Sequence, residues 1–478
     1  MFTLAEALAG LGAAPEDLPA SLSTVKFTGA SNDSRAIQPG QIFVALRGET
    51  QDGHDFIGDA LGRGATGVLA ERTVDLPEGA WVLDLRGKAP AIPSRPFQAP
   101  AYFLVTDALK SLQSLAGYWR SKLPVDVVGI TGSVGKTSTK EMIASVLSQR
   151  FKVLKSEKNL NNEIGLPLTL LRLEPSHQKA VLEIGMYGLG EIALLSSLAR
   201  PRVGVITNVG PSHLERLGAI ERIAQAKVEL VEALPPEGYA ILNGDDPVVR
   251  QMATKTRATV FIYGQESNFD LWASQVESRG LEGIRLCLHY GRESLYLKIP
   301  LLGAHSAHTA LAATAVGLVM GLTWEEIAGG LSRVPEQLRL IVVPGINGST
   351  LIDDTYNSSP ASALAALNLL AELPGRHVAV LGDLLELGTY EDEGHRLVGR
   401  RALEVAARLV VVGERGRIIG QEALACGRDP EDVYFASSNQ EAIQHLGSML
   451  APGDVVLLKG SRGMRMEEIV NALRTDGA

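Results

Sequence analysis

Residues 125–142, VDVVGITGSVGKTSTKEM, place a glycine turn between an apolar run and a stretch of helical spacing. The run Val125–Ile130 is rich in β-branched residues and has the length of a buried strand. From Thr137 to Leu147, apolar residues recur three and four positions apart, which is the period of a helix. A strand, a glycine turn and a helix N-terminus gather unpaired backbone N–H groups at the positive end of a helix. The segment therefore predicts a phosphate-binding loop.

The side chains that close this loop suit a nucleoside triphosphate. Lys136 can reach the terminal phosphates, and the hydroxyl of Thr137 suits magnesium. Ile130 stands where a strict Walker A pattern has glycine, and Gly129 lies one residue earlier. The alternative is an ordinary strand-to-helix turn with a solvated lysine. The sequence favours ATP or GTP binding, and the predicted loop contacts are Gly132, Ser133, Gly135, Lys136, Thr137 and Ser138.

Length and composition limit the class of protein. A chain of 478 residues is long enough for about three domains. The net charge of −9 argues against non-specific binding to nucleic acid. The two cysteines, Cys287 and Cys426, lack metal-ligand spacing and indicate a reducing compartment without a disulfide framework.

The sequence predicts a cytoplasmic protein without a membrane span. Glu6 interrupts the first apolar stretch and no basic segment precedes it, unlike a secretory leader. The most apolar stretch, Ala310–Leu322, is too short to cross a bilayer and suits a buried helix.

Strand and helix patterns alternate along the chain, which predicts an α/β fold with three domains. Residues 1–110 would form a small N-terminal α/β domain, and residues 111–335 a central P-loop domain with a mostly parallel sheet and an antiparallel portion. Residues 336–478 would form a C-terminal Rossmann-like, doubly wound domain. The predicted elements include strands 42–46, 180–185, 203–207 and 239–243, an antiparallel meander of 260–263, 284–289 and 294–299, a buried helix at 302–322, and C-terminal strands 350–353, 377–381, 409–412 and 454–458.

Three polar residues of the central domain are candidates for chemistry. Glu183 is an acid near the carboxyl end of an apolar strand, where ligands sit in open α/β sheets. It either holds magnesium or faces water on an edge strand. His213 follows the strand at 203–207 and is either structural or a ligand. The pattern around Lys227, in a predicted helix, favours a surface lysine whose stem lies on apolar neighbours.

Polar residues also follow strands in the outer domains. Ser34, Arg35 and Arg47 fall at turns around the strand at 42–46, and the planar fork of arginine suits phosphate. In the C-terminal domain, the segment 459–465 places a lysine, a hydroxyl and two arginines beside a glycine turn, which suits an anion. Taken alone, the pattern around Ser34, Arg35 and Arg47 favours solvated surface arginines, and a solvated loop explains the C-terminal pattern equally well.

Nine segments of the chain, in order, resemble the Mur ligase family and cover nearly its whole length. The pair DDTYNSSP and LGDLLELG points to the branch that adds D-alanyl-D-alanine. The resemblance implies that ATP converts the terminal carboxylate of UDP-N-acetylmuramoyl-tripeptide to an acyl phosphate, which the amine of D-alanyl-D-alanine then attacks. The segments are NDSRAIQPGQIFVALRGE, TGSVGKTSTKEM, NLNNEIGLPLTLL, EIGMYGLGEI, TNVGPSHLERLG, AKVEL, IDDTYNSSP, VLGDLLELG and KGSRGMRMEEIV.

The same resemblance implies roles for individual residues. ATP and two magnesium ions would bind the central domain, Lys227 would be carbamylated, and the protein would be a monomer. The implied catalytic residues are Lys136, His213, Lys227 and Arg339, and the implied magnesium ligands are Thr137, Glu183, His213 and Lys227. Further contacts to ATP would come from Asp353, Tyr356 and Asn357; the UDP part would meet Ser34, Arg35, Arg47 and Gly48; and Lys459, Ser461 and Arg462 would lie near the dipeptide or the acyl phosphate.

The chain departs from the family pattern at three positions. Val134 stands where the phosphate loop of the family often has asparagine, and Ser306 and Thr309 stand where asparagines help to place adenine. Two alternatives remain at this point: a ligase of the same family with a different acceptor, and a P-loop switch or binding protein. A catalytically dead homologue would have lost a central residue, yet Lys136, Glu183, His213 and Lys227 are all present.

Overall fold

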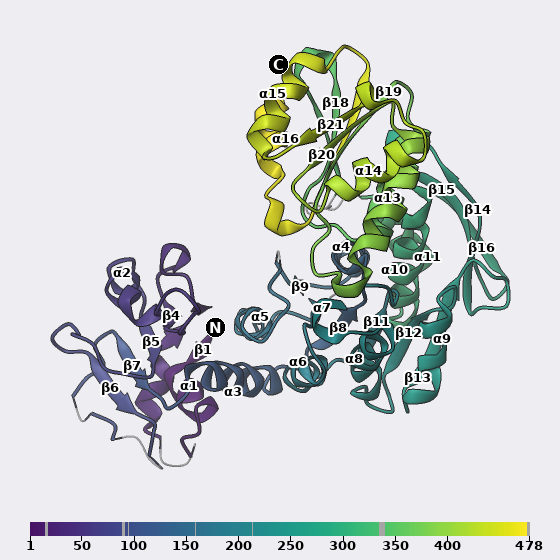
Figure 1. Cartoon of the computed structure of the whole chain (residues 1–478). Helices are drawn as coiled ribbons and strands as arrows, with labels where there is room; N and C mark the ends of the chain where they lie inside the picture. Colours follow the sequence, from purple (N-terminus) through teal and green to yellow (C-terminus); the bar gives the residue numbers. More distant parts are fainter. Residues whose placement is uncertain are drawn as a thin grey trace. The chain divides into compact units, whose positions relative to one another are not determined.

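Parallel strands linked by helices make up most of the computed structural model, which describes residues 1–14, 18–87, 91–93, 95–157, 159–212, 214–333 and 340–475. The fold is mixed α/β, as the sequence predicts (Figure 1). The chain divides into two compact units. The first contains Met1–Gly129, Phe151–Met186 and Gly190–Arg202, and the second contains Ile130–Arg150, Tyr187–Leu189 and Val203–Ala478.

The first unit begins with a five-stranded sheet in which every strand is parallel to its neighbours, in the order β3-β4-β5-β7-β6. A two-residue ladder, β1 with β2, precedes it. The elements are β1 (Phe2–Thr3), α1 (Leu4–Gly10), β2 (Lys26–Phe27), β3 (Gly29–Ser31), β4 (Gln41–Val44), α2 (Ile57–Gly62), β5 (Gly67–Ala70), β6 (Trp81–Asp84) and β7 (Ala101–Leu104), with 3₁₀ turns η2 (Ala20–Thr24), η3 (Ser34–Ala36) and η4 (Gly53–Phe56).

The rest of the first unit contains helices and strands on either side of the phosphate-loop strand in the sequence. Strand β8 begins in this unit and ends in the second, and β10 pairs with β9 in parallel. The elements are α3 (Ala108–Ser121), β8 (Asp126–Thr131), β9 (Val153–Lys155), α5 (Gly165–Leu170), β10 (Lys179–Glu183) and α6 (Glu191–Ala199).

The second unit opens with the helix of the phosphate loop and continues through parallel strands β11 to β14. Helix α10 is almost wholly apolar and nine of its residues are buried, which confirms the buried helix predicted from the sequence. The elements are α4 (Lys136–Leu147), β11 (Val203–Ile206), α7 (Leu214–Leu217), α8 (Ile220–Glu232), β12 (Tyr239–Asn243), α9 (Pro247–Gln251), η5 (Met252–Lys255), β13 (Thr259–Gly264), η7 (Ala304–Ser306), α10 (Ala307–Val319) and α11 (Trp324–Leu331).

The antiparallel meander consists of β14 (Leu271–Ser278), β15 (Ile284–Tyr290) and β16 (Glu293–Ile299), with η6 (Gly280–Glu282) between the first two strands. The prediction that 260–263 belongs to it is wrong, because β13 pairs in parallel with both β12 and β14. Strand β14 was missing from the prediction. Its ladder is irregular between Ser274 and Glu277, and Gln275 has a φ of 51°, so the alternation of a regular strand is interrupted.

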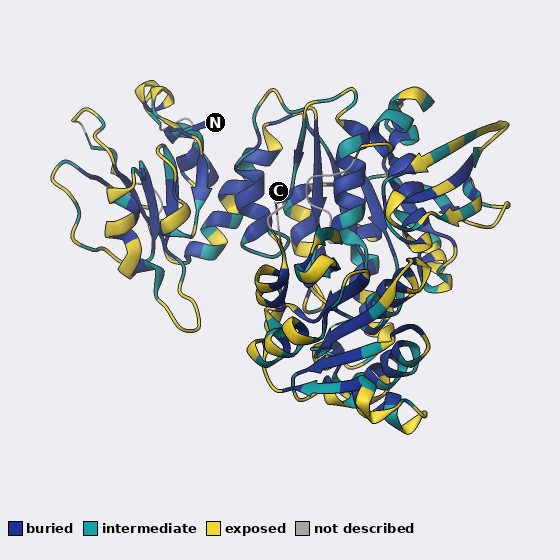
Figure 2. Cartoon of the chain, turned by 90° about the horizontal axis from the view of Figure 1, so that it is seen from above, coloured by how far each residue is buried: buried dark blue, intermediate teal, exposed yellow. Residues whose placement is uncertain are grey.

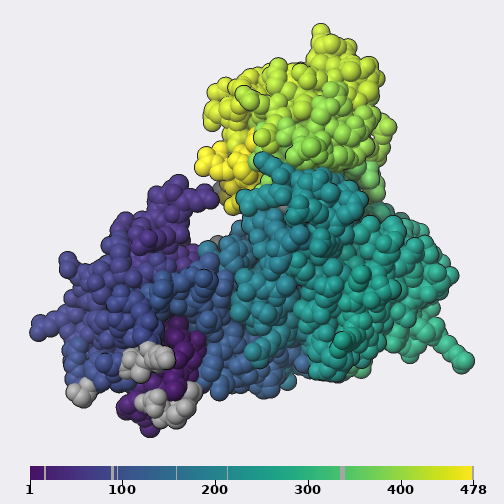
Figure 3. All heavy atoms as spheres, turned by 60° about the horizontal axis from the view of Figure 1, so that its bottom comes forward, coloured from purple at the N-terminus to yellow at the C-terminus, as the bar shows by residue number. Residues whose placement is uncertain are grey.

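The C-terminal segment folds as a six-stranded sheet in the order β17-β18-β22-β19-β20-β21. Only the edge pair β17 and β18 is antiparallel among these neighbours. Figure 3 shows this segment, coloured green to yellow, as one continuous body of atoms. The elements are β17 (Ile341–Pro344), η8 (Ile346–Gly348), β18 (Thr350–Asp354), α12 (Pro360–Glu372), β19 (Arg376–Gly382), η9 (Gly388–Tyr390), α13 (Glu391–Val405), β20 (Arg408–Val412), α14 (Arg417–Ala425), η10 (Pro430–Asp432), β21 (Val433–Ala436), α15 (Asn439–Met449), β22 (Asp454–Lys459), η11 (Arg462–Met464) and α16 (Glu467–Leu473).

Local chemistry explains where several helices begin. Thr3 and Glu6 form a capping box at α1, and Ser359 caps α12 directly before Pro360. The strands supply the cores, and most of them are dark blue in Figure 2. In the C-terminal sheet, alternate residues of each strand pack on helices α12 to α14 or on α15 and α16, which is the arrangement of a doubly wound domain.

The three large sheets lie in the three segments that the sequence assigned to domains. Of the two predicted boundaries, the one at residue 110 falls inside α3, and the one at residue 335 lies outside the described residues. In the part of the chain that the structure describes, no helix is long and apolar enough to cross a membrane.

Candidate functional site

The phosphate loop joins β8, which ends at Thr131, to α4, which begins at Lys136. Two of its glycines are required by geometry. Gly132 has a φ of 153°, and a Cβ there would lie 1.9 Å from the hydroxyl oxygen of Thr207. Gly135 has a φ of 84° and caps the helix, a left-handed conformation that favours glycine. The predicted strand, glycine turn and helix are therefore all present.

Lys136 lies across the loop that it closes. Its Nζ donates to the carbonyl oxygens of Gly132, at 2.6 Å, and Ser133, at 3.2 Å. The residue is half-buried, as are Ser133 and Ser138, while Thr137 behind it is buried. An ammonium held over backbone carbonyls at a helix N-terminus is placed to meet an anion there.

Lys227 lies on α8 and is 2% exposed, so it is not the surface lysine that its sequence pattern suggested. Burial lowers the pKa of its amine well below the ordinary value, and the nearby charge of Lys136 lowers it further. Its amine is therefore held toward the neutral form beside the phosphate loop.

Glu183 ends β10 in the first unit and is 1% exposed, so it does not face water. The side chain of Asn161 donates to its carboxylate at 2.9 Å. Thr137 and Lys227 belong to the second unit, and His213 and Arg339 lie outside the described residues. Within the described ranges, no group of three or more histidine, cysteine, aspartate or glutamate side chains is arranged to hold a metal ion.

The residues predicted to meet ATP from the C-terminal segment lie at the carboxyl end of β18. The Asp353 carboxylate accepts from the backbone N–H and hydroxyl of Thr355, at 3.0 and 2.7 Å. Asn357 accepts from the N–H of Ser358 at 2.9 Å. The guanidinium of Arg462 lies 5.4 Å from the ring centre of Tyr356, and the arginine side chain is 64% exposed. Arg462 and Tyr356 therefore meet at one strand edge.

Lys459 and Ser461, predicted near the dipeptide, are buried beneath this edge. The Nζ of Lys459 donates to the carboxylate of Asp354 at 2.6 Å and to the carbonyl of Asn357 at 3.0 Å. The hydroxyl of Ser461 accepts from the N–H of Leu385 at 2.8 Å. These contacts join the ends of β18, β19 and β22, because β22 pairs with both β18 and β19.

The four predicted contacts to the UDP part follow β3 and β4, which are neighbours in the N-terminal sheet. Ser34 is buried, whereas the side chain of Arg35 is 81% exposed and pairs with Asp33 at 2.9 Å. Arg47 is exposed and lies 3.6 Å from Glu71, and the N–H of Gly48 donates to the carbonyl of Gln51. All four lie beyond the carboxyl ends of parallel strands, where α/β sheets bind ligands.

Ser306 and His308 occupy the helix entrance that the resemblance connects with adenine. The Ser306 hydroxyl donates to the carbonyl of Leu302 at 2.7 Å. The Nε2 of His308 lies 2.8 Å from the carboxylate of Asp245, a residue whose role the sequence left open. Asp246 beside it caps α9 and accepts the N–H of Val209 at 2.7 Å.

Several residues that shape these loops were missing from the sequence prediction. Asn208, Asp354 and His395 each bond to backbone or charge far away in the chain. Their position directly after, or packed on, strand ends was the available signal, but their partners are visible only in the fold.

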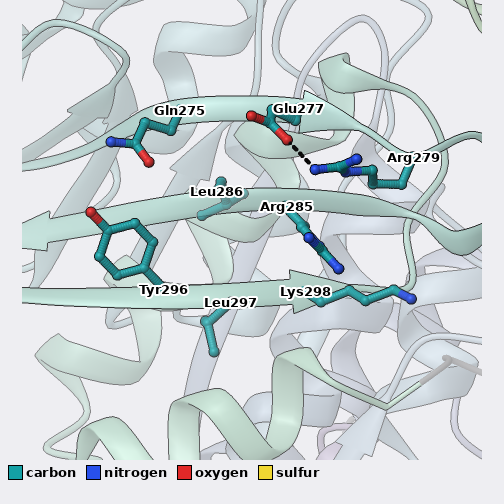
Figure 4. Close-up of a pocket in the computed structure, with 8 residues that line it drawn as sticks. All are labelled: Gln275, Glu277, Arg279, Arg285, Leu286, Tyr296, Leu297 and Lys298. Carbon is teal, nitrogen blue, oxygen red and sulfur yellow. Dashed lines mark hydrogen bonds and ion pairs between the residues drawn. The ribbon is translucent and has the colours of Figure 1, made fainter.

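A separate hollow of about 420 Å³ lies on the antiparallel meander (Figure 4). None of the residues that line it is a predicted site residue. Glu277 and Arg279 pair along one side of it at 2.6 Å, and Lys298 pairs with Glu282 at 2.6 Å. Its lining residues are Gln275, Glu277, Arg279, Arg285, Leu286, Tyr296, Leu297 and Lys298. The lining carries one acidic and three basic side chains, and two of the basic ones are in ion pairs with Glu277 and Glu282.

The family patterns that match this chain are those of Mur ligases, and together with three similar ligases they cover most of its length. The pattern of the Mur ligase family catalytic domain matches residues 26–93, that of the Mur ligase middle domain residues 130–317, and that of the Mur ligase glutamate ligase domain residues 338–462. A UDP-N-acetylmuramoyl-tripeptide–D-alanyl-D-alanine ligase from Bacillus subtilis is 37% identical over 93% of each chain. Those from Synechocystis sp. and Escherichia coli are 36% and 35% identical over 94% of this chain and 92% and 94% of theirs.

Solved structures give the same result for the fold. A MurF from Acinetobacter baumannii superposes with a TM-score of 0.82 at 28% identity, over 98% of each chain. A MurF ligase from Thermotoga maritima, solved in complex with ADP, superposes with a TM-score of 0.77 at 27% identity, over 95% of this chain and 98% of that one.

The phosphate loop on a mostly parallel sheet, followed by a doubly wound α/β segment, defines the class: an α/β nucleotide-binding protein of the P-loop kind. The full-length likeness to known ligases narrows this class. The chain belongs to the Mur ligase family.

Proposed function

We propose that this chain is an ATP-dependent ligase that joins D-alanyl-D-alanine to UDP-N-acetylmuramoyl-tripeptide in peptidoglycan precursor synthesis. One observation carries the proposal: relatives of that name are 35–37% identical over 93–94% of the chain. The phosphate loop supplies a place for ATP, and the relative from Thermotoga maritima was solved with ADP. We place the reaction in the cytoplasm, where ATP is available.

The reaction has to convert a poor electrophile to a good one. The terminal carboxylate of the tripeptide attacks the γ-phosphorus of ATP, so that a C–O–P linkage forms and ADP leaves. The amine of D-alanyl-D-alanine then attacks the acyl carbon, the amide bond forms, phosphate leaves and the amine loses a proton. Because a carboxylate and a triphosphate are both anions, positive groups must bring them together.

Lys136 is the described residue best placed for this task. Its ammonium lies over the carbonyl oxygens of Gly132 and Ser133 at the mouth of the loop. The loop N–H groups and the start of α4 would hold the remaining phosphate oxygens.

Magnesium and a carbamylated Lys227 are a further part of the proposal. Burial and the charge of Lys136 lower the pKa of the Lys227 amine, which favours the neutral form that adds carbon dioxide to give a carbamate. The carbamate oxygens, the Thr137 hydroxyl and the Glu183 carboxylate are hard donors that suit this cation, and His213 would complete the set. Bound magnesium would neutralise the charge on the phosphates. The burial of Lys227 and the lowered pKa of its amine are the observations that fit this set.

The substrate contacts follow from the strand ends. Ser34, Arg35, Arg47 and Gly48 would hold the UDP part, because arginine forks and backbone N–H groups suit a diphosphate. Asp353, Tyr356 and Asn357 would meet ATP, and the exposed Arg462 would meet the dipeptide or the acyl phosphate. Lys459 and Ser461 would support this surface from below.

The deciding assay measures phosphate release with ATP, magnesium and UDP-N-acetylmuramoyl-tripeptide, with and without D-alanyl-D-alanine. We expect release to depend on the dipeptide and the product to be heavier by the dipeptide less water. Both the diaminopimelate and the lysine form of the tripeptide are supplied, since the motifs do not specify its third residue. Release with another acceptor alone would move the substrate within the family, and ATP binding without any release would favour a switch protein.

Substitution of Lys227 tests the carbamate. We expect Lys227→Ala to lose activity because a magnesium ligand is removed, and short carboxylates or bicarbonate to restore part of it. Intact-mass measurement under carbon dioxide should show the adduct on the wild-type chain only. Full activity of the alanine variant would contradict the assignment.

A further inference from the structure

The backbone of Val134, in the middle of the phosphate loop, is fully paired to one distant side chain. The N–H of Val134 donates to Oδ1 of Asn208 at 2.9 Å, and Nδ2 of Asn208 donates back to the Val134 carbonyl at 2.9 Å. The two residues are 74 positions apart in the sequence. A carboxamide paired with a peptide group in this way fixes both the position and the orientation of that peptide.

The segment that carries Asn208 holds the loop at further points. The Thr207 hydroxyl donates to the Val134 carbonyl at 2.7 Å, and the Ser133 N–H donates to the Asn208 carbonyl at 3.0 Å. The Ser133 hydroxyl donates to the Gly210 carbonyl and lies 2.9 Å from the Gly210 nitrogen as well. Residues 133 and 134 of the phosphate loop are therefore hydrogen-bonded to residues 207–210 through both backbone and side-chain groups.

A second layer holds residues 207–210 in turn. The side chain of Asn243, at the end of β12, donates to the Thr207 carbonyl at 2.8 Å. One carboxylate oxygen of Asp246 accepts the N–H of Val209 at 2.7 Å, while the other caps α9 through Val248 and Val249. Asp246 thus ties this segment to a helix that begins beside the next strand of the sheet.

We propose that Asn208 is a positioning residue for the phosphate loop and that Asp246 holds the segment carrying it. This proposal rests on the proposed function, because it assumes that the loop binds ATP. It extends that function to two residues that act through the loop backbone and would not touch the nucleotide. The groups of residues 207–210 that contact the loop are amides and hydroxyls, so this segment adds no charge of its own beside the phosphate-binding turn. The backbone of residue 134 is set by Asn208 whatever its side chain, which accounts for Val134 at a position where the family often has asparagine.

The test uses two substitutions at Asn208. Asn208→Ala removes the side chain, whereas Asn208→Leu keeps its size and neutrality but removes both hydrogen bonds. We expect each to weaken the binding of Mg-ADP, measured by calorimetry, by roughly tenfold to a hundredfold, the equivalent of two lost hydrogen bonds. The KM for ATP should rise in parallel, while the KM for the UDP precursor should stay within about twofold, since its predicted contacts lie elsewhere.

The matched control is Asn439→Ala in the C-terminal segment. Asn439 is also half-buried, and its Nδ2 donates to the carbonyls of Met464 and Arg465, at 2.9 and 3.2 Å. It should lower the melting temperature to a similar degree and leave ADP affinity unchanged. If Asn208→Leu binds ADP like the wild type, or if both asparagine variants lose affinity equally, the positioning role is overturned.

Asp246→Ser tests the second layer. Serine retains the capping of α9 but is too short to reach Val209, so only the tie to the loop segment is lost. We expect ADP affinity to fall by about threefold to tenfold, less than at Asn208, because a single bond is removed one step farther away. Unchanged affinity would remove Asp246 from the proposal. A wild-type chain that binds ADP but forms no amide would overturn the proposed function alone, since binding requires no ligase chemistry.

Discussion

Two strand-end clusters in the second unit, the phosphate loop after β8 and the loop after β18, are held in place by opposite chemistry. The phosphate loop is held by the neutral side chains of Thr207 and Asn208. The loop after β18 is held by a buried ion pair between Lys459 and Asp354, which are 2% and 8% exposed. Both clusters contain a lysine beside glycine and hydroxyl residues, yet the two lysines have different tasks.

By our proposal, burial separates a lysine that binds ligand, Lys136, from one that supports the fold, Lys459. The ammonium of Lys136 is half-buried at a loop mouth, over carbonyl oxygens. The ammonium of Lys459 is enclosed and directed at a carboxylate 2.6 Å away. Loss of one partner of a buried pair leaves an uncompensated charge, whereas loss of both is often nearly neutral. Substitution of Lys136 should therefore lower activity, whereas substitution of Lys459 should lower stability.

Lys136→Ala should have the largest effect, and that effect should be on activity. Removal of the cation that meets the phosphates should lower kcat/KM by about 10⁴-fold, or ~5.5 kcal/mol of transition-state stabilisation. The unfolding midpoint should change less than for Lys459, since Lys136 is half-buried at the loop whereas Lys459 is enclosed. Phosphate release and chemical denaturation of the same preparation measure both quantities. A large loss of stability in Lys136→Ala would mean that Lys136, like Lys459, supports the fold, and would contradict the proposed difference between the two lysines.

Lys459→Met should act on stability instead. We expect the C-terminal sheet to lose about 3–5 kcal/mol of unfolding free energy, because Asp354 would remain buried and charged. The double variant Lys459→Met, Asp354→Leu should recover most of that loss. Denaturant titration followed by far-ultraviolet circular dichroism measures the unfolding free energy of each variant. If Lys459→Met folds like the wild type and loses only dipeptide binding, the lysine faces ligand after all.

The sequence was sufficient to locate the phosphate loop because its determinants are local. A β-branched run, glycines at positive φ and a helix start lie within a few residues of one another. The sequence could not distinguish the role of Lys136 from that of Lys459, because Asp354, the partner of Lys459, is 105 positions away. The same reason hid Asn208, whose bonds with Val134 exist only once β8 and β11 lie in the sheet.

The fold itself was predictable where strands were long and apolar. The parallel strands β11, β12, β19, β20 and β22 match predicted segments to within a residue or two. The short edge strands β17 and β21 were missing from the prediction. All four residues of β17 are exposed or half-buried, and β21 is buried only at its two ends, so neither carries a clear periodic signal. Packing against neighbours, which no local pattern records, decides such segments.

His395 provides a pH-dependent contrast between the two regions. Its buried Nε2 accepts the N–H of Leu384 at 3.0 Å, and Nδ1 lies 2.7 Å from the Glu391 carbonyl, so the neutral ring fastens the loop after β19. Burial lowers its pKa below 6.5, an effect that Arg415 reinforces and that Glu391 and Asp383 oppose. Below about pH 6.5 the unfolded chain binds a proton that the folded chain does not, so stability should fall as the pH falls.

The measurement compares unfolding midpoints of wild type and His395→Gln between pH 8 and pH 5. At pH 8 the variant should be less stable by ~1–2 kcal/mol, the cost of a buried hydrogen bond. The gap should narrow toward pH 5, where the wild type loses the contribution of the neutral ring. The two proteins share every other titratable group, including Lys227 beside the phosphate loop, so the difference between their curves reports His395 alone. Parallel curves for the two proteins would contradict the assignment.

Ser461→Ala should have the smallest effect and sharpens the distinction between support and ligand contact. The Ser461 hydroxyl accepts from Leu385 at 2.8 Å and donates to the Ser358 carbonyl at 3.3 Å, joining the loops after β19 and β18. Its removal should cost about 1 kcal/mol of stability. The exposed Ser448, whose hydroxyl bonds only to the local carbonyl of His445, is the control, and Ser448→Ala should stay within ~0.5 kcal/mol.

The kinetic result of the same variant then decides between two roles for Ser461. A supporting residue that acts through Leu385 and Ser358 should change the KM values for ATP and for the dipeptide to a similar, small extent, because both loops shift together. A residue that touches the dipeptide should raise the KM for D-alanyl-D-alanine alone. Since Ser461 is 3% exposed and both of its hydrogen bonds go to backbone, we expect the first result. This strand edge would then present Arg462 and Tyr356 to ligand, with Lys459 and Ser461 as the layer beneath.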